Sequence, residues 1–335
     1  MQPHTLLIGT MDGLCAARLN GGRYEVERLD LDGTGAVFFP TQDVDREGRY
    51  YAATWNRGVV RSDDAGASWT EMTDGLRYKH LWSLAQDSST GRLYAGSEPA
   101  AIFVSDDAGD HWEELPTLRR HPDSEFWAFP TPPHIAHVKH IDVGPSAPGR
   151  ILAAIEEGWI ARSEDGGETW ENIKDNVAFD SHTIYTMPND PDIVLTSSAT
   201  GLSRSEDGGR TYAESVDGLT HSYLTHLVVH PKTPDVVMTS AAEVKPPLWR
   251  ARPIGANAAF FRSDDQGRTW ARRTSGVPDV ITAAPRCSAG DPDDPDVFLS
   301  GFNDGSVWMT TDGGDSYREV LSGLGFVFSI AVMRS

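Results

Sequence analysis

The stretch RSEDGGETW, residues 162–170, brings three carboxylates, two glycines, two hydroxyls and a tryptophan together, and near-copies of it recur along the chain. The other copies are RSDDAGASW (61–69), VSDDAGDHW (104–112), RSEDGGRTY (204–212), RSDDQGRTW (262–270) and TTDGGDSY (310–317). They share the pattern S-x-D-x-G-x-[ST]-[WY], with Thr310 in place of the serine and His111 in place of the hydroxyl residue. Successive aromatic positions are 43, 58, 42, 58 and 47 residues apart, which indicates a unit of about 40–45 residues with two insertions.

A repeat of this length with four short strands per unit is typical of a β-propeller blade. Strand-like runs precede each motif, as in HIDVG, ILAAI and WIARS within residues 140–163, so we expect strands A, B and C before the motif and strand D after it. Residues 5–28 supply strands B, C and D of a further blade, and residues 325–333 supply its strand A. Pairing the two ends of the chain would close the ring and remove exposed strand edges.

The sequence therefore predicts an all-β fold, a seven-bladed β-propeller in which six blades carry the motif and the seventh is closed by the N- and C-terminal strands. We expect one domain over residues 1–335, with insertions at 116–135 and 241–260. The expected blades cover residues 5–30 with 325–333, 35–73, 79–116, 135–174, 181–216, 222–274 and 279–321.

The repeated motif resembles the Asp box, or BNR repeat, of sialidases, xyloglucanase-type glycosidases, sortilin-type receptors and photosystem assembly factors. The resemblance spans residues 61–317 and implies that the motifs lie on the face opposite an active site. Their residue types also suit a structural role. Asp165 can accept hydrogen bonds from turn amides, Gly167 can adopt a positive φ, and Trp170 can pack between blades. We expect the motifs to shape the blades and not to carry chemistry.

Composition and charge exclude several classes of partner. The net charge of −20 argues against binding to nucleic acid, which requires a basic face. No stretch approaches the 18–20 or so apolar residues that cross a bilayer, and the N-terminus lacks the basic start and apolar run of a signal peptide. Two cysteines are too few for a disulfide framework. We expect a cytoplasmic protein with neither nucleic-acid nor membrane partners.

Carboxylates gather in the turns between strands B and C, which share one propeller face with the D–A loops, opposite the motifs. Glu98, Glu156 and Glu157 occupy these turns in blades 3 and 4 and are the candidate catalytic residues. A solvated turn is the alternative explanation, since turns are polar in any protein.

Histidines mark the starts of the A strands on blades 4, 5 and 6. His140 and His226 each lie five residues before the proline of the A–B turn, whereas His182 lies six residues before its own and is one residue out of register. Together with a carboxylate such as Glu157, these three imidazoles suit a divalent metal cofactor, Zn, Mn, Fe or Cu. The alternative is that they hydrogen-bond between blades.

Both insertions belong to the same face, where long loops on a rigid scaffold often contact substrate. They carry Trp127, Trp249 and Arg250, and Arg57 and Arg286 are expected near the axis. These candidate substrate-binding residues suit a small molecule, anionic or carbohydrate, because aromatics stack on rings and arginines hold carboxylates or phosphates. The alternative is that the loops cover blade surface or form an oligomer contact.

The first functional hypothesis is a small-molecule hydrolase or lyase with a His/Glu, metal-binding site at the axis. The alternatives are a non-catalytic protein-binding or assembly propeller and a carboxylate-based glycosidase. The early R-I-P sequence of sialidases is missing, which argues against sialidase activity. A single propeller also lacks half of the cleft that xyloglucanase-type enzymes build from two.

Overall fold

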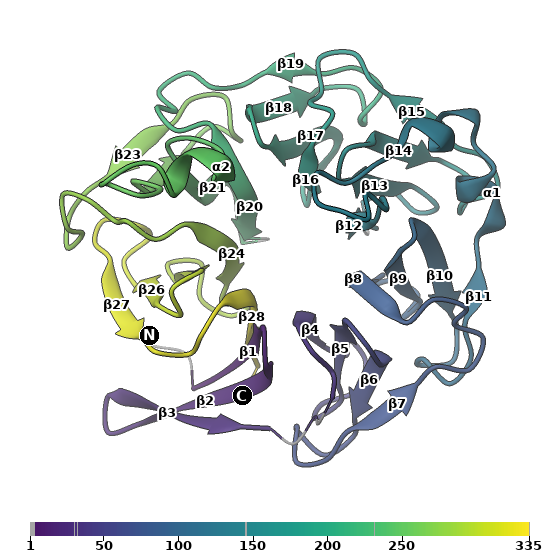
Figure 1. Ribbon diagram of the computed structural model, residues 1–335, viewed down its shortest axis with the longest axis horizontal. Coiled ribbons are helices and arrows are strands. Elements are labelled where there is room, and N and C mark those ends of the chain that lie inside the picture. The colour runs from purple at the N-terminus through teal and green to yellow at the C-terminus, as the bar shows by residue number, and fades with distance from the viewer. Residues whose placement is uncertain (1–3, 30, 32, 145, 231, 335) are drawn as a thin grey trace.

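The computed structural model describes residues 4–29, 31, 33–144, 146–230 and 232–334, and these residues form seven four-stranded antiparallel sheets around a common axis (Figure 1). Blade 1 consists of β28 (Val327–Met333), β1 (Thr5–Thr10), β2 (Gly13–Asn20) and β3 (Arg23–Arg28). Blade 2 consists of β4 (Val37–Gln42), β5 (Tyr50–Thr54), β6 (Gly58–Ser62) and β7 (Thr70–Met72). Blade 3 consists of β8 (His80–Gln86), β9 (Leu93–Glu98), β10 (Ala101–Ser105) and β11 (Glu113–Glu114).

The remaining four blades follow in chain order around the ring. Blade 4 consists of β12 (Val138–Asp142), β13 (Ile151–Ile155), β14 (Trp159–Ser163) and β15 (Glu171–Ile173). Blade 5 consists of β16 (Ser181–Met187), β17 (Asp190–Ser198), β18 (Gly201–Ser205) and β19 (Ala213–Glu214). Blade 6 consists of β20 (Tyr223–His230), β21 (Thr233–Ala242), β22 (Ala259–Ser263) and β23 (Ala271–Arg273). Blade 7 consists of β24 (Pro285–Gly290), β25 (Phe298–Phe302), β26 (Val307–Thr310) and β27 (Arg318–Leu321).

The predicted seven-bladed propeller is confirmed, and so is its closure. Strand β1 pairs with β2 on one side and with β28 on the other, with Thr5 opposite Met333 and Ile8 opposite Ile330. In Figure 1 the C-terminal β28 lies beside the N-terminal β1, at the place where the ring closes. Both ends of the chain are therefore needed to complete blade 1.

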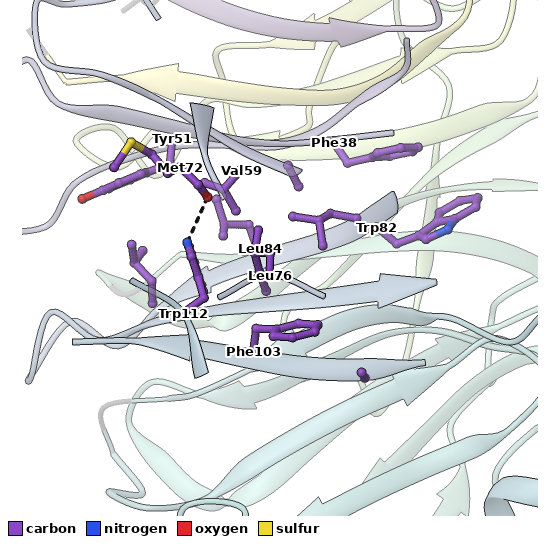
Figure 2. Close-up of a cluster of buried hydrophobic side chains, with 14 of the residues drawn as sticks. Phe38, Tyr51, Val59, Met72, Leu76, Trp82, Leu84, Phe103 and Trp112 are labelled. Carbon is purple, nitrogen blue, oxygen red and sulfur yellow. Dashed lines mark hydrogen bonds between the residues drawn. The ribbon is translucent and has the colours of Figure 1, made fainter. Parts of the chain in front are cut away.

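The core lies between neighbouring blades, because each sheet buries both of its faces. The middle strand β13 (ILAAI) is buried at every residue, whereas the outermost strand β3 of blade 1 is largely exposed. Figure 2 shows the cluster between blades 2 and 3, where Trp112 is 1% exposed. Its indole Nε1 donates to the backbone oxygen of Met72 in the neighbouring blade at 3.1 Å. The aromatic residue of this motif thus joins two sheets.

The motif RSEDGGETW forms the hairpin between β14 and β15, as expected. Ser163 donates to Asp165 at 2.8 Å and accepts from the backbone N–H of Gly167, while Asp165 accepts from the backbone N–H and the hydroxyl of Thr169 at 2.9 and 2.5 Å. The Thr169 hydroxyl is the main cause that lowers the pKa of Asp165 to about 2. Gly167 has a φ of 92°, which favours glycine. The predicted local role of the motif is confirmed at this hairpin.

The other copies repeat this pattern with one informative departure. Asp64, Asp207, Asp265 and Asp312 each accept from the backbone N–H and the hydroxyl of the Ser or Thr four residues later. In blade 3 the backbone N–H of His111 still donates to Asp107 at 2.9 Å, but its ring Nδ1 contacts Asp74 at 2.7 Å instead. The backbone part of the turn therefore survives the loss of the hydroxyl.

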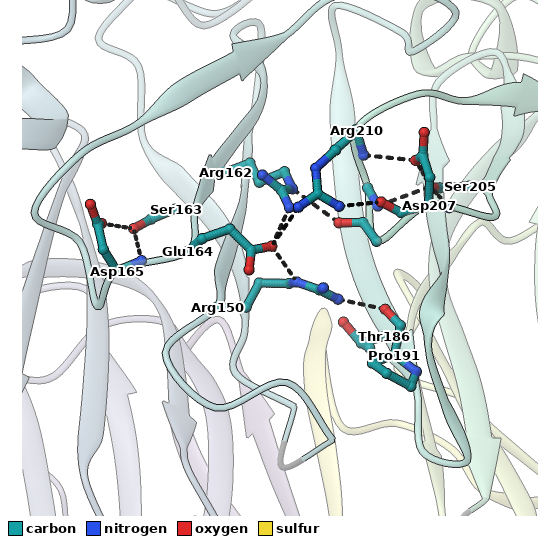
Figure 3. A network of polar contacts seen from close by, with 12 residues as sticks. Arg150, Arg162, Ser163, Glu164, Asp165, Thr186, Pro191, Ser205, Asp207 and Arg210 are labelled. Carbon is teal, nitrogen blue, oxygen red and sulfur yellow. Dashed lines mark hydrogen bonds and ion pairs between the residues drawn. The ribbon is translucent and has the colours of Figure 1, made fainter.

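Arginines at the first motif position link four of the six hairpins to the next blade. Arg162 donates from Nε to the backbone oxygen of Gly208 in the following motif at 3.0 Å, and Glu164 lies between Arg162 and Arg150 (Figure 3). The same link recurs from Arg61 to Ala108, from Arg204 to Gln266 and from Arg262 to Gly313. Side chains thus join neighbouring blades at four junctions of the motif end.

The insertions contribute the few helical residues, which are α1 (Pro116–Arg119), the 3-10 helix η1 (Pro122–Phe126) and α2 (Pro246–Trp249). None of these helices, within the described ranges, has the length and apolar character that a bilayer-spanning helix needs. The backbone N–H of Ala128 donates to the backbone oxygen of Glu157 at 3.0 Å, so the first insertion reaches the end of the propeller that carries the B–C turns. This end is opposite the motif hairpins.

Candidate functional site

Each innermost strand contains an extra residue near the end of the propeller that carries the B–C turns. In β12, Val138 pairs with Ile155 and His140 with Ala154, so Lys139 has no partner in β13. Such a β-bulge bends the strand and re-aims the side chain at the bulge. Equivalent shifts occur in the other inner strands of the described chain, at Phe328, at Phe39 with Pro40, at Trp82, at His182, at Thr225 with His226, and at Arg286.

These bulges enclose a small cavity at the propeller axis. The cavity measures about 20 Å³, room for one or two water-sized atoms. Its lining includes one bulge residue from every blade, here called the bulge ring: Phe328, Phe39, Trp82, Lys139, His182, His226 and Arg286. The lining also includes Phe38, Tyr223 and Thr225. The seven bulges therefore aim at one point.

The bulge ring divides into two arcs of different chemistry. Blades 1, 2 and 3 contribute the aromatic arc, Phe328, Phe39 and Trp82, whereas blades 4 to 7 contribute the basic arc, Lys139, His182, His226 and Arg286. Phe39 has a φ of 45°, a strained conformation for a residue with a side chain. Its ring lies 5.4 Å from that of His140 and 5.8 Å from that of His226. The strained bulge thus packs the Phe39 ring against the two imidazole rings.

Glu156 is the most heavily contacted carboxylate at this end. Its Oε2 lies 2.7 Å from the Lys139 ammonium and 2.9 Å from His137 Nε2, which leaves Oε1 for other contacts. Burial raises the pKa of a carboxyl, but the Lys139 charge and the His137 hydrogen bond outweigh it, and the pKa of Glu156 lies well below its ordinary value. Glu156 is therefore a buried anion. Trp82 stacks on the His137 ring with centroids 3.8 Å apart, which fixes that imidazole in place.

His182 and Asp180 place two lone-pair-bearing atoms close together. His182 Nδ1 lies 2.5 Å from the backbone oxygen of Leu224, and because a carbonyl only accepts, Nδ1 carries a proton. His182 Nε2 lies 3.2 Å from Asp180 Oδ1, yet neither atom has a hydrogen-bond partner among the described residues. A proton or a cation between these buried atoms would remove the repulsion between their lone pairs.

The spacing of these atoms suits a metal ion. Donor atoms of Glu156, Asp180 and His182 lie within 4.8 Å of one another, the one such group of three His, Cys, Asp or Glu residues in the described part of the chain. Two ligands in tetrahedral geometry around zinc lie about 3.4 Å apart, which is close to the 3.2 Å between His182 Nε2 and Asp180 Oδ1. One imidazole and two carboxylates are a common donor set for zinc and other divalent metals. The group thus fits a metal in two respects. Its donor atoms are of suitable types, and two of them, Asp180 Oδ1 and His182 Nε2, have no hydrogen-bond partner among the described residues.

The other two candidate catalytic carboxylates flank this group. Glu98 accepts from Trp82 Nε1 at 2.9 Å and lies 3.6 Å from His137 Nδ1, and burial raises the pKa of Glu98. Glu157 is half-buried, and burial, followed by the charges of Asp180 and Glu156, raises its pKa above the ordinary value. Glu156 and its two neighbours therefore have pKa values shifted in opposite directions.

The strand pairing corrects the predicted register of the histidines. His182 and His226 lie within bulges, whereas His140 follows the bulge and pairs with Ala154. His140, and not His182, is thus the residue out of register. Burial lowers the pKa of His140 to about 4, and the pKa of His226 lies well below its ordinary value because of burial and then nearby His140 and Lys139. His182 belongs to the candidate metal group, while His140 and His226 lie outside it.

The candidate substrate-binding residues separate into two groups. Arg286 lines the cavity, and Trp249 packs edge-on against Tyr223, which in turn packs edge-on against His182. Arg57 instead forms an ion pair with Glu71, and Trp127 is buried in the core beside Gly158. Arg250 is exposed just after α2. Only the first group touches the bulge ring or a residue that lines it.

The sequence candidates do not include three residues of this site: Lys139 and Asp180, which carried no recognised signal, and His137, which was set aside in favour of His140. His137 and Lys139 lie in the HIAHVKH stretch (134–140). Lys139 directly precedes His140, and only the strand pairing shows that the lysine occupies the bulge. Asp180 stands two residues before His182 in FDSHTIY, and that spacing was an available signal. A carboxylate just before an inner strand, such as Asp180 before β16, lies at the same end of the propeller as the bulge residue of that strand.

Comparison with solved structures agrees with the geometry of the fold. A GH74 xyloglucanase from Xanthomonas campestris aligns with a TM-score of 0.69 and 18% identity over 99% of this chain and 53% of that chain. A GH74 enzyme from Niastella koreensis aligns with a TM-score of 0.63 and 15% identity over 84% of this chain and 45% of that one. The chain thus spans about half the length of these two enzymes.

A third similar structure comes from a different class of protein. YCF48 bound to a D1 peptide aligns with a TM-score of 0.56 and 15% identity over 85% of this chain and 80% of that one. No protein-family model and no curated protein sequence matches the chain. Identities this low show a shared fold alone, and that fold is the β-propeller.

Proposed function

We propose that the protein is a metal-dependent hydrolase or lyase that acts on a small molecule at the propeller axis, opposite the repeated motifs. Glu156, Asp180 and His182 are the proposed ligands. The observation that carries the proposal is the buried pair of His182 Nε2 and Asp180 Oδ1, 3.2 Å apart and without hydrogen-bond partners within the described residues. Buried polar atoms are nearly always satisfied, so this pair calls for a proton or a cation between its two atoms, and the nearby Glu156 donor favours a metal ion.

The proposed ligand set keeps one histidine of the sequence prediction and replaces the other two with carboxylates. The donor types still suit Zn, Mn or Fe, whereas two carboxylates make Cu a poorer match. The resemblance of the hairpin motif to the Asp box supports a site on this face. The two free, buried cysteines, Cys15 and Cys287, are consistent with a cytoplasmic setting.

Each surrounding residue has a role in this proposal. A divalent metal in this position would act as a Lewis acid on a substrate oxygen. Glu157, half-buried and with a raised pKa, would move a proton to or from the substrate as the general acid or base. His137, stacked on Trp82 and hydrogen-bonded to Glu156, is a positioning residue that fixes the Glu156 carboxylate, and its Nδ1 lies 3.6 Å from Glu98.

The test is the metal content of the purified protein and of variants that separate the two ligand sets. We expect stoichiometric Zn, Mn or Fe in the unmodified protein and loss of it in His182→Ala and Asp180→Asn. His140→Gln is the matched control, since it alters a buried histidine beside the site and should retain the metal. Circular dichroism would verify that each variant folds.

Two outcomes contradict the proposal. A protein that takes up none of these metals, even when each is supplied, has no such centre. Metal loss in His140→Gln with retention in Asp180→Asn would restore the histidine set that the sequence suggested.

A non-catalytic, protein-binding function is the second candidate, and exposed apolar side chains favour it. Phe126 is 59% exposed and Ile135 is 37% exposed in the first insertion, and Leu248 is 48% exposed in the second. Exposed apolar residues on loops are typical of protein contacts. A metal-free protein in which Phe126→Ser and Leu248→Ser leave folding unchanged but abolish capture of a partner would favour this candidate.

A further inference from the structure

We infer that the basic arc of the bulge ring binds a carboxylate group of the substrate, beside the proposed metal centre. The inference rests on the proposed function for the reaction, but the binding of the anion follows from the ring itself. It assigns a ligand class to the axial cavity: a small carboxylic acid.

The charge of the cavity lining is the first argument. Its polar side chains are Lys139, His182, His226 and Arg286 with the hydroxyls of Tyr223 and Thr225, and none of the ten residues that line the cavity is an Asp or Glu. The chain as a whole has a net charge of −20. Because Lys139 is already paired with Glu156, the group of the lining that is free to attract an anion by its charge is the Arg286 guanidinium, whose Nε has no hydrogen-bond partner in the described ranges.

Unpartnered buried nitrogens are the second argument. Lys139 is engaged by Glu156, and His182 by Leu224. Buried Nδ1 of His226 and buried Nε of Arg286, by contrast, have no hydrogen-bond partner in the described ranges, and the His226 side chain is only 8% exposed. Leaving two such groups unsatisfied is costly, and a carboxylate would accept from Arg286 Nε and, in the tautomer with a proton on Nδ1, from His226 as well.

The size of the cavity selects the group that enters it. A volume of about 20 Å³ takes one or two water-sized atoms, which matches the two oxygens of a carboxylate and excludes a sugar ring. Phe328, Phe39 and Trp82 line the opposite side of the ring and make it apolar. A hydrogen bond from arginine to a carboxylate is stronger in such an apolar setting than in water.

The position of His182 connects the carboxylate to the chemistry. His182 lines the cavity and also belongs to the candidate metal group with Glu156 and Asp180. A substrate held by its carboxylate at Arg286 and His226 would therefore place nearby atoms at the metal. The bond that reacts is expected close to the carboxylate, as it is in small hydroxy or keto acids.

The test measures anion binding to the metal-free protein, so that a carboxylate bound to the metal itself does not contribute. Isothermal titration calorimetry with acetate and with benzoate, after chelation, should show binding, and acetamide should show none. Arg286→Gln and His226→Gln should each weaken acetate binding about 10- to 100-fold, the usual effect of losing a charge-assisted hydrogen bond. Arg250→Gln, an arginine at the same end outside the ring, should leave it unchanged.

Further arms of the experiment distinguish other anions and the failure of each proposal. Tight binding of chloride or inorganic phosphate without binding of acetate would overturn the inference. Equal acetate affinity in Arg286→Gln, His226→Gln and Arg250→Gln would also overturn it. The metal content of Arg286→Gln should match that of the unmodified protein. Carboxylate binding in a protein that takes up no metal would support this inference while refuting the metal centre.

Discussion

The two ends of the propeller use repetition in opposite ways. At the motif end, six hairpins repeat the same chemistry, and each Asp accepts a backbone N–H four residues on, as Asp165 does from Thr169 and Asp107 from His111. At the bulge ring, the fold repeats a position but each group of blades fills it differently, with aromatics on three blades and basic residues on four. Identical residues at equivalent positions mark the framework. Different residues at equivalent positions, with donors left unpaired, mark the candidate site.

The largest effect that would sharpen this comparison is expected at the motif end. Trp112→Ala removes a side chain that is 1% exposed and leaves the Met72 oxygen without its donor, so we expect a loss of about 3–5 kcal/mol in the free energy of unfolding. Urea denaturation followed by circular dichroism measures it. Trp170→Ala, at a half-buried motif position, should cost less.

The metal content of folded Trp112→Ala decides whether the two ends are separable. We expect it to equal that of the unmodified protein, because the tryptophan belongs to a motif hairpin and the candidate metal group lies at the opposite end of the propeller. Loss of metal from a folded variant would show that the motif end also shapes the site.

A smaller effect is expected from the links between hairpins. Arg162→Gln removes a side chain that is 3% exposed and donates to Gly208 at 3.0 Å, so we expect about 1.5–3 kcal/mol less stability. Arg268→Gln is the control, because its side chain is 53% exposed and a surface ion pair contributes little. Equal denaturation midpoints for the two variants would mean that the arginine links add nothing to the framework.

The smallest effect concerns acid stability. Burial raises the pKa of Asp207, but the hydrogen bonds from Thr211 and Ser205 outweigh it and lower the pKa to about 2. Since an unfolded Asp has a pKa of about 3.9, this carboxylate stabilises the fold above that pH and its contribution is lost as the pH falls toward about 2.

Asp207→Asn should therefore flatten the decline in stability between pH values of about 4 and 2, as measured by urea denaturation across that range. The exposed Asp279→Asn is the comparison, and the slope of its curve should match that of the unmodified protein. An unaltered slope in Asp207→Asn would remove the motif carboxylates from the acid response.

Much of the fold was predictable because the same short motif occurs six times, and each copy independently indicates a blade. The spacing of the motif aromatics predicted the number of blades, and the lone strand at residues 325–333 predicted the closure with β1. The roles of Asp165, Gly167 and Trp170 followed from turn chemistry alone. These inferences depend on residues close together in sequence, for which the backbone rules are strong.

The details of the site were less accessible because they depend on one-residue shifts in pairing. Counting back from the turn proline placed His140 level with His226, but the bulge of β12 falls at Lys139. A bulge changes the strand by one residue and leaves no mark in the composition. The convergence of Asp180, which precedes β16, on Glu156 from blade 4 is likewise a contact between loops that local patterns do not encode.

The closure of blade 1 also bears on the order of events during synthesis. Among the described strands, β1 is synthesised before the others and its inner neighbour β28 after them, so β1 keeps an unpaired edge while six blades form. The bulge of β28 supplies Phe328, one wall of the axial cavity. A nascent chain that stops short of residue 328 would have an open ring and an incomplete cavity. Completion of the site and completion of the fold thus coincide at the last strand.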